Sequence, residues 1–125
     1  MPNLLLVMVG GAIGAGLRFE VGRLALRQFG PGFPWGTLIV NLVGGFCAGL
    51  LVGLLVREGL GGEPVRLFVG LGLLGGFTTF SAFSLETFNM IARGQYGVAG
   101  LYAAASVAGS VLALWLGLVA VKAAA

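Results

Sequence analysis

The sequence contains no histidine, a single cysteine and few charged residues. Without histidine, the chain has neither a histidine-ligated metal site nor a histidine-based catalytic triad. Its one cysteine, Cys47, cannot form an internal disulfide and is expected to be a small packing residue. Only 9% of the 125 residues are charged, whereas soluble domains carry about 25% charge. So few charges cannot cover a water-facing surface, and the chain belongs to the membrane class.

The seven basic residues do not form a patch. Most of them flank apolar segments, as the anchors of membrane helices do. They are Arg18, Arg23, Arg27, Arg57, Arg66, Arg93 and Lys122. Binding to nucleic acid would need a clustered basic stripe, so no nucleic-acid partner is expected. The expected surrounding is a lipid bilayer.

The chain is rich in hydrophobic residues, which make up 58% of the sequence. A membrane-spanning helix needs about 20 such residues to cross about 30 Å of hydrocarbon. Four segments qualify, at about 3–28, 35–56, 64–92 and 96–121, and turns rich in glycine and proline separate them. The pattern predicts an all-α integral membrane protein, a single four-helix transmembrane domain over residues 1–125.

The first apolar run also has a second interpretation. A cleaved signal peptide contains such a run after a basic region. The stretch "MPNLLL" at 1–6 has no basic residue. A first membrane span is therefore the favoured interpretation.

The 24 glycines predict close helix packing, because helices in lipid associate through small residues. Gly45, Gly49 and Gly53 recur every four residues and give the second span a small-residue face. The pair Gly10 and Gly14 does the same in the first span, and "LYAAASVAGS" (101–110) in the fourth. We expect few of these glycines to contact a substrate.

The basic residues also bear on topology. If the helices alternate in direction, one side of the membrane has Arg57, Arg66 and Lys122. The other side has Arg23, Arg27 and Arg93, with Arg18 as a possible fourth. So even a distribution gives almost no positive-inside bias. Such a chain can insert both ways and pair as an antiparallel dimer.

Two apparent catalytic signals are weak. The stretch "GLGLLG" (70–75) matches a dinucleotide-binding pattern, but that pattern needs a preceding strand and an exposed helix start. Ser81 and Ser84 have no histidine to activate them and no lysine near in sequence. The four acidic residues are scattered and suggest no acid–base pair. The chain is not expected to be an enzyme.

Polar residues inside the spans are the better candidates, because they are costly in lipid and usually functional. Asn41 follows Thr37 in the second span and could either bond across helices or face a pathway. In the fourth span Tyr102, Ser106 and Ser110 recur every four residues and form one polar stripe. Serines alone often bond to their own helix, but a tyrosine on the same stripe favours a lined path.

The stretch "GLLGGFTTFSAFSLETF" (72–88) lies near the middle of the third span. Gly75 and Gly76 weaken a helix there, and the hydroxyls that follow can bond freed backbone groups. Broken helices at membrane depth expose carbonyls that can coordinate a cation. Phe80 and Phe83 share a helix face, and the positive edge of an aromatic ring suits a small anion. The competing interpretation is that both rings are ordinary core residues.

Three blocks of the sequence resemble the Fluc (CrcB) fluoride channel family. "GGAIGAGLRF" (10–19) is similar to the family's G-G-x-x-G-A-x-x-R-[YF] opening, and "GTLIVNLVGGFCAG" (36–49) to its G-T-L-x-V-N-x-x-G-x-F-x-x-G block. "GLLGGFTTFSAFSLE" (72–86) is similar to its G-x-x-G-[GA]-x-T-T-F-S-[TA]-F-[SA]-x-E signature. The blocks cover three of the four spans in order. Phe19 stands where tyrosine is usual and Ala82 where threonine is frequent.

The resemblance implies a dual-topology, antiparallel homodimer with two pores in the bacterial plasma (inner) membrane. It would conduct fluoride passively out of the cytoplasm, where the neutral acid that enters from acidic surroundings dissociates and is trapped. Export would relieve fluoride toxicity. The even charge count is consistent with inverted pairing.

The resemblance also implies residue roles. Phe80 and Phe83 match the phenylalanines whose ring edges contact fluoride, and Asn41 matches the pore asparagine. Gly75 and Thr78 match the positions whose main-chain carbonyls bind a structural sodium ion (Na+) at the dimer centre. The other polar positions of the fluoride pore are Thr79, Ser81, Glu86, Tyr102 and Ser106. Arg18 matches the arginine of the first block, and the roles of Arg18 and Glu20 stay open.

Two other classes of membrane protein share some of these features. A small multidrug-resistance-type proton-coupled cation transporter also has four short helices and dual topology, but it relies on a carboxylate within its first span. Residues 4–17 contain no acid, and Glu20 lies near Arg18 and Arg23. A non-conducting assembly subunit would not need the Thr-Thr-Phe-Ser interruption. Fluoride flux without a proton gradient separates the channel from both.

Overall fold

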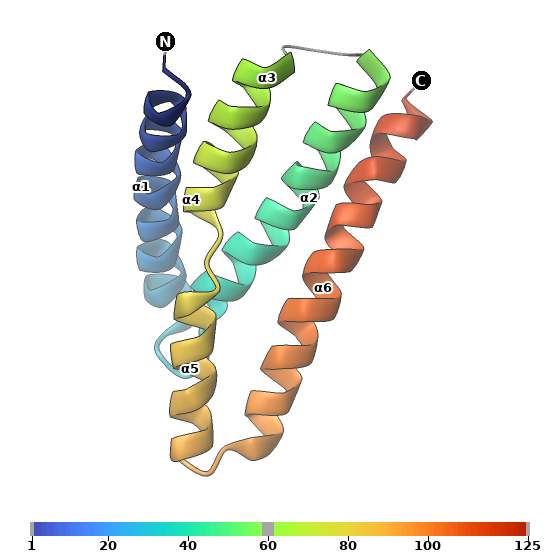
Figure 1. Cartoon of the computed structure of the whole chain (residues 1–125). Coiled ribbons are helices and arrows are strands. Elements are labelled where there is room, and N and C mark those ends of the chain that lie inside the picture. Colours follow the sequence, from blue (N-terminus) through green and yellow to red (C-terminus); the bar gives the residue numbers. More distant parts are fainter. Residues whose placement is uncertain (1, 59–61, 125) are drawn as a thin grey trace.

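The computed structural model of the chain describes residues 2–58 and 62–124, and all of its regular elements are helical. In chain order they are α1 (Asn3–Phe29), α2 (Trp35–Glu58), α3 (Gly62–Val65), η1 (Arg66–Leu74), α4 (Gly75–Phe77), α5 (Ser81–Ala92) and α6 (Tyr96–Ala123). Figure 1 shows them as one elongated bundle with both termini at the same end. The middle of the predicted turn at 57–63 lies outside the described residues.

Four stretches of the described chain are long and apolar enough to cross a membrane. They are Asn3–Phe29, Trp35–Leu55, Glu63–Ala92 and Tyr96–Ala123. The prediction of an all-helical protein with four apolar spans is therefore confirmed. The reason is simple: in lipid every backbone polar group must be satisfied within the protein, which a helix does by itself.

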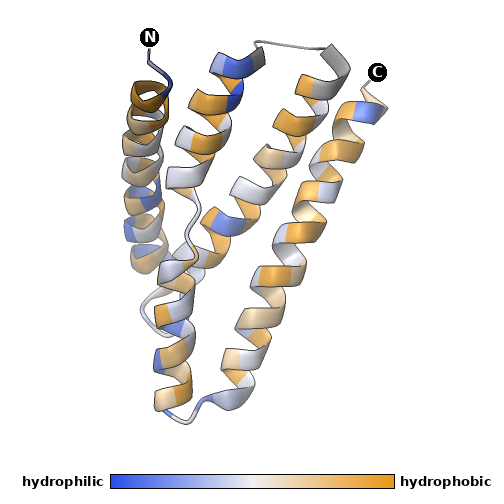
Figure 2. Cartoon of the chain, in the orientation of Figure 1, coloured by the Kyte–Doolittle hydropathy of each residue, from blue (hydrophilic) through white to orange (hydrophobic). Residues whose placement is uncertain are grey.

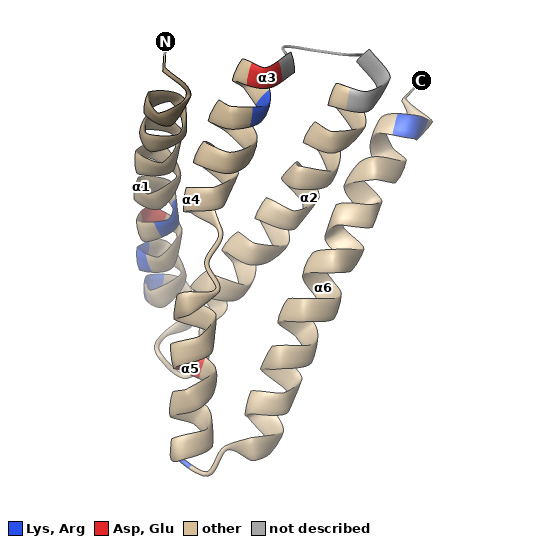
Figure 3. Ribbon diagram, viewed as in Figure 1, with Lys and Arg blue, Asp and Glu red and all other residues tan. Residues whose placement is uncertain are grey.

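The surface of the bundle has the composition of a lipid-facing one. Large apolar side chains such as Leu4, Leu101 and Val111 are about two-thirds exposed, at 69%, 69% and 66%. In Figure 2 the hydrophobic colour recurs along all of the long helices, and the strongly hydrophilic colour is limited to short stretches. Figure 3 shows charges mainly on the second half of α1 and at helix ends, apart from Glu86 inside α5.

Glycine seams hold the long helices together. Along the seam between α2 and α6, a Cβ atom added to Gly45 would lie 2.7 Å from the Ser110 carbonyl oxygen. One added to Gly49 would overlap the Leu114 carbonyl oxygen. Close approach of backbones is how membrane helices gain packing energy. The predicted role of these glycines in packing is confirmed.

A second seam joins α1 to the third span. A Cβ atom on Gly10 would lie 2.9 Å from the backbone nitrogen of Leu73, and one on Gly14 would lie 2.7 Å from that of Phe77. On the opposite helix, a Cβ on Gly76 would overlap the backbone of Gly11. This seam places the first half of α1 directly against the part of the third span that leads to the candidate site.

The third span is the least regular of the four. Its first half runs as a short α-turn, a π-helical stretch and the single turn α4, which ends at Phe77. Residues 78–80 are not helical, Thr78 is extended (φ −84°, ψ 159°), and α5 begins at Ser81. Gly75 and Gly76, where the sequence suggested a weak helix, are themselves helical. Gly76 contributes to the glycine seam, and the helix ends beyond the pair, at Phe77.

A cluster of buried residues lies beside the second half of the third span. Its members are Leu38, Met90, Ala99 and Tyr102, with Phe33, Leu42, Phe83 and Ala105 packed against them. The turns at this end of the bundle use glycines in the left-handed region, Gly30 and Gly94, both at φ 78°. The core thus fixes α2, α5 and α6 around the residues that the sequence singled out.

Candidate functional site

The non-helical residues 78–80 are held by the side chain of Asn41, which projects from α2. Its Nδ2 donates to the Thr79 carbonyl oxygen (3.0 Å), and its Oδ1 accepts from the Thr79 backbone N–H (2.9 Å). The amide therefore replaces, for one residue, the hydrogen bonds that a continuous helix would supply. Of the two alternatives for Asn41, the structure shows the bond across helices. It leaves the second Nδ2 hydrogen without a described partner.

Hydroxyl groups satisfy more of the backbone around this segment. Thr78 Oγ1 donates to the Leu74 carbonyl oxygen (2.9 Å), and Thr79 Oγ1 accepts from the Ala82 backbone N–H (3.1 Å). The latter bond satisfies one of the free N–H groups at the start of α5, as a helix cap does. Ser81 Oγ lies 3.4 Å from Thr79 Oγ1. The threonines of the signature thus support the backbone rather than serve only as lining.

The carbonyl oxygens of the segment fall into two groups. Those of Leu74, Gly76 and Thr79 accept hydrogen bonds from Thr78, Arg18 and Asn41, respectively. Those of Gly75, Phe77 and Thr78 accept none that is recorded within the described residues. Of these three, Gly75 and Thr78 line an open hollow on the surface of the chain. Unpaired main-chain oxygens in such a place can coordinate a cation.

A second polar cluster surrounds Glu86 of α5. Thr37 Oγ1 of α2 donates to its Oε2 (3.1 Å), and the Tyr102 hydroxyl of α6 donates to its Oε1 (2.9 Å). Each carboxylate oxygen therefore has its own donor, from a different helix. A carboxylate at membrane depth is costly unless it is hydrogen-bonded in this way.

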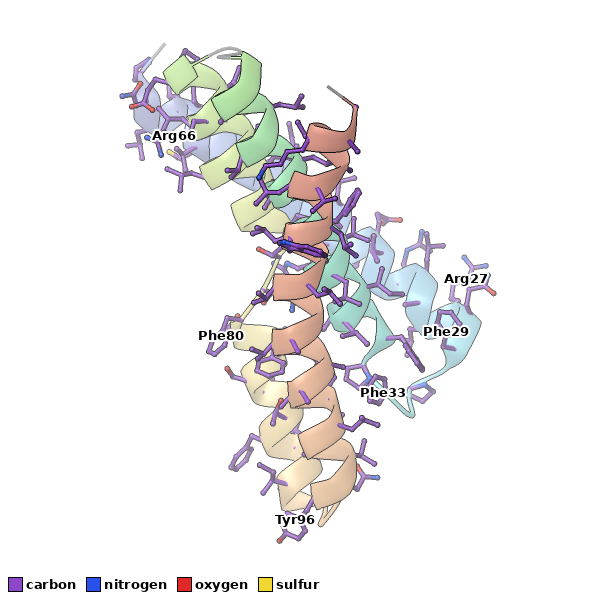
Figure 4. All side chains as sticks on the ribbon, turned by 90° about the vertical axis from the view of Figure 1, so that its right-hand side faces the viewer. Arg27, Phe29, Phe33, Arg66, Phe80 and Tyr96 are labelled. Atoms are coloured by element: carbon purple, nitrogen blue, oxygen red, sulfur yellow. The ribbon has the colours of Figure 1, made fainter. Side chains whose placement is uncertain are left out.

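Aromatic rings connect the two polar clusters. The ring centroids of Phe80 and Phe83 are 5.5 Å apart, and those of Phe83 and Tyr102 are 5.2 Å apart. Phe33 meets Tyr102 edge-on at 5.3 Å. Phe83 is half-buried against the core, whereas Phe80 is 75% exposed and stands away from the ribbon in Figure 4. Packing within this chain therefore explains the position of the Phe83 ring in part. It does not explain the exposed position of the Phe80 ring.

The hollow beside these rings has a volume of about 550 Å³. Its lining is largely apolar and includes seven of the residues that the sequence singled out: Asn41, Gly75, Thr78, Thr79, Phe80, Phe83 and Ser106. Ser106 is only 6% exposed, and its hydroxyl oxygen has no hydrogen-bond partner within the described chain. A buried hydroxyl without a partner is destabilising unless something else binds it.

Nearly all of the predicted site residues therefore lie in one region. Glu86 and Tyr102 adjoin the hollow through Phe83, and Ser81 is exposed at the start of α5. Sequence reasoning missed the bond between Thr37 and Glu86. The signal was present, because Thr37 precedes Asn41 by four residues and shares its helix face. It also gave no role to Arg18, whose guanidinium reaches the third span.

Four apolar spans around a polar, aromatic-lined segment define a multi-pass helical membrane protein. A family model described as "CrcB-like protein, Camphor Resistance (CrcB)" matches residues 5–118. The chain belongs to this family, which consists of ion channels and not of enzymes, and it is a multi-pass protein of the bacterial inner membrane.

Three curated relatives are similar over nearly the whole chain, and each is named "Fluoride-specific ion channel FluC". The protein of Sphingopyxis alaskensis is 57% identical over 122 residues, which are 98% of this chain and 97% of the relative. That of Mesorhizobium japonicum is 54% identical over 94% of both chains. That of Rhizobium etli is 50% identical over 98% of both chains.

Proposed function

We propose that this protein is a fluoride channel and that fluoride passes along the aromatic rings and polar groups around residues 78–83. Support comes from the name shared by relatives that match nearly the whole chain. The single observation that carries the proposal is the exposed ring of Phe80, which lines one hollow together with Phe83 and Asn41.

The chemistry of this region suits a small anion. An aromatic ring has a positive edge, and Phe80 and Phe83 offer two rings 5.5 Å apart. The Ser106 hydroxyl and the second hydrogen of Asn41 Nδ2 are donors that an anion would accept. Fluoride must exchange its hydration shell for such partners, since an ion without them is costly to bury.

The path continues towards one end of the bundle through the second polar cluster. Glu86 carries a negative charge that would repel fluoride, but Thr37 and Tyr102 each donate to it. These two donors hold the carboxylate against α2 and α6. Because each hydroxyl gives its one hydrogen to the carboxylate, the two donors would reduce the repulsion that a passing anion meets but would not themselves bind it.

A second copy of the chain would complete the site. The hollow is open on one side, its lining is mainly apolar, and Phe80 projects from it. An exposed apolar surface rimmed by polar groups is typical of an interface. The family resemblance and the even distribution of basic residues favour an antiparallel homodimer of dual topology, with two pores.

Gly75 and Thr78 are the candidates to bind a structural sodium ion at the dimer centre. Their carbonyl oxygens have no described hydrogen bond, and both residues line the hollow that the second copy would cover. The described residues contain no cluster of His, Cys, Asp or Glu for a metal ion, so a cation here would depend on main-chain oxygens, which suit a hard ion. Two inverted copies would together supply four carbonyls. When bound, the ion would add a fixed positive charge between the two copies.

The direction of transport follows from the chemistry of the ion and not from the channel. Hydrogen fluoride is a weak acid whose neutral form crosses lipid, so acidic surroundings load the cytoplasm with fluoride. A passive pore then lets the anion leave down its gradient. The proposed role is export that relieves fluoride toxicity.

The transporter alternative is not favoured. The first span has one acidic residue, Glu20, which is about half exposed and forms an ion pair with Arg23 at 2.7 Å. A carboxylate paired in this way on the outer surface of α1 is not placed to exchange protons for a cation in the interior.

The proposal is tested with purified protein in liposomes loaded with potassium fluoride. Valinomycin lets potassium leave with the fluoride and so keeps charge balanced, and a fluoride electrode records release with equal pH on both sides. We expect fast fluoride release, and retention of chloride in matched potassium chloride liposomes. Fluoride release no faster than from protein-free liposomes would overturn the proposal.

A further inference from the structure

Arg18 reaches from the first span to the interrupted part of the third span. Its Nε donates to the Gly76 carbonyl oxygen at 3.2 Å, and the side chain is half-buried. Arg18 lies well inside the apolar stretch Asn3–Phe29. Because a guanidinium at such a depth is costly, an arginine there is normally retained for a specific interaction.

The carbonyl that Arg18 binds lies at the end of a helix. Gly76 is the last residue but one of α4, and the helix stops at Phe77. The last carbonyls of a helix have no intrahelical partner and carry partial negative charge, which a cation stabilises. Arg18 therefore supplies both a hydrogen bond and a positive charge where the backbone lacks them.

The glycine seam explains how this contact forms. Gly14, one turn before Arg18, lies so close to the third span that an added Cβ would be 3.1 Å from the carbonyl carbon of Gly76. This approach brings the base of the Arg18 side chain next to α4. No other basic side chain of the described residues is recorded as donating to the third span from another helix: Arg23 of α1 donates to Glu20.

Two side chains thus fix the backbone on both sides of Thr78. Arg18 holds Gly76 from α1, and Asn41 holds Thr79 from α2. We infer that Arg18 is a positioning residue, which fixes the carbonyl end of α4 and through it residues 78–80. The expected effect of Arg18 on conduction rests on the proposed function. Its effect on the backbone does not.

The test compares three variants of the full-length dimer. R18M removes the charge and every side-chain donor, R18K keeps a charge and a donor, and R23M is the control, which makes the same change elsewhere on the same helix. Hydrogen–deuterium exchange is measured in peptides that cover the amides of Thr79 and Ala82, which bond to Asn41 and Thr79. Fluoride efflux is measured on the same samples.

In R18M we expect exchange at these amides about ten- to hundredfold faster than in the wild type, since a hydrogen bond to a charged group is lost. Fluoride efflux should fall at least tenfold. R23M should match the wild type in exchange, and R18K should recover most of the protection. If R18M gives no dimer, R18K becomes the deciding variant, and tenfold faster exchange in R18K would contradict the inference.

Unchanged exchange in R18M overturns the inference even if efflux falls, because the arginine then does not position this backbone. Equal exchange in R18M and R23M would overturn it for the same reason. A wild-type protein that conducts no fluoride would overturn the proposed function alone, since the exchange measurement does not depend on conduction.

Discussion

The side chain of Asn41 forms a pair of reciprocal hydrogen bonds with the backbone of Thr79, at 3.0 Å to its carbonyl oxygen and 2.9 Å from its N–H. An asparagine on one span therefore fixes the non-helical residue of another. One of its two amide hydrogens is used in this way, and the other has no described partner. Under the proposed function the same side chain would both hold the segment and contact a passing anion.

Asn41→Asp tests this double role. The carboxylate still accepts from the Thr79 N–H, but it cannot donate to the carbonyl or to an anion, and its charge repels fluoride. We expect fluoride efflux from reconstituted liposomes to be abolished while the protein still elutes as a dimer. Wild-type efflux from a properly assembled variant would show that Asn41 acts only in helix packing and not in conduction.

Tyr102→Phe removes one of the two donors to Glu86 and keeps the aromatic ring. The loss of a hydrogen bond to a charged group should lower stability by about 1.5–3 kcal/mol. The freed carboxylate should slow fluoride efflux, by about tenfold. Tyr96→Phe is the matched control, because Tyr96 is 70% exposed at the start of α6. Equal thermal stability and efflux in the two variants would show that the bond to Glu86 is unimportant.

Gly49→Ala tests the seam between α2 and α6. The added methyl group would overlap the Leu114 carbonyl oxygen, and such overpacking costs about 1–3 kcal/mol or more. We expect a lower melting temperature and less dimer after purification. Gly100→Ala adds the same group to α6 where nothing lies within 4 Å, and it should leave both unchanged. A normal melting temperature for Gly49→Ala would mean that α2 and α6 are not as closely packed at Gly49 as the structure shows.

The helices and their glycine seams could be predicted from the sequence because lipid leaves few alternatives. Apolar length decides what spans the membrane, and small residues decide where backbones approach. The position of the irregular segment was predicted less well. Glycine pairs weaken isolated helices, yet Gly76 is held in α4 by its packing against Gly11. The described helix ends at Phe77, and the side chains of Asn41 and Thr79 satisfy the backbone beyond it.

The contacts between spans could not be predicted. Thr37 and Glu86 are 49 residues apart in the sequence, and Arg18 and Gly76 are 58 apart. A single sequence gives the face of a helix on which a residue lies, but not which face of another helix it meets. Composition could suggest that a polar residue in a span has a partner, and only the packed structure identifies that partner.

Dual topology predicts a distinctive labelling pattern. A cysteine in the turn between α1 and α2, Gly32→Cys in a Cys47→Ser background, would face both sides of the membrane in equal populations. We expect a membrane-impermeant maleimide to label about half of the protein in intact cells, because the basic residues give no orientation bias. Complete labelling or none at all would mean a single orientation. Permeabilised cells provide the full signal for comparison.

The central claim is that fluoride passes along the edges of Phe80 and Phe83, and Phe→Ile substitutions measured by fluoride efflux test it most directly. Isoleucine is similarly apolar but offers no ring edge. Phe88→Ile is the control, since Phe88 lies on α5, as Phe83 does, and is 64% exposed.

Phe80→Ile is the sharper of the two variants, because a ring that is 75% exposed contributes little packing within the chain. On monodisperse dimer, we predict that efflux per dimer falls about a hundredfold or more in Phe80→Ile and in Phe83→Ile, as loss of a partner for a desolvated ion raises the barrier by several kcal/mol. Phe88→Ile should conduct like the wild type. Near-normal fluoride efflux through both pore variants would contradict the account.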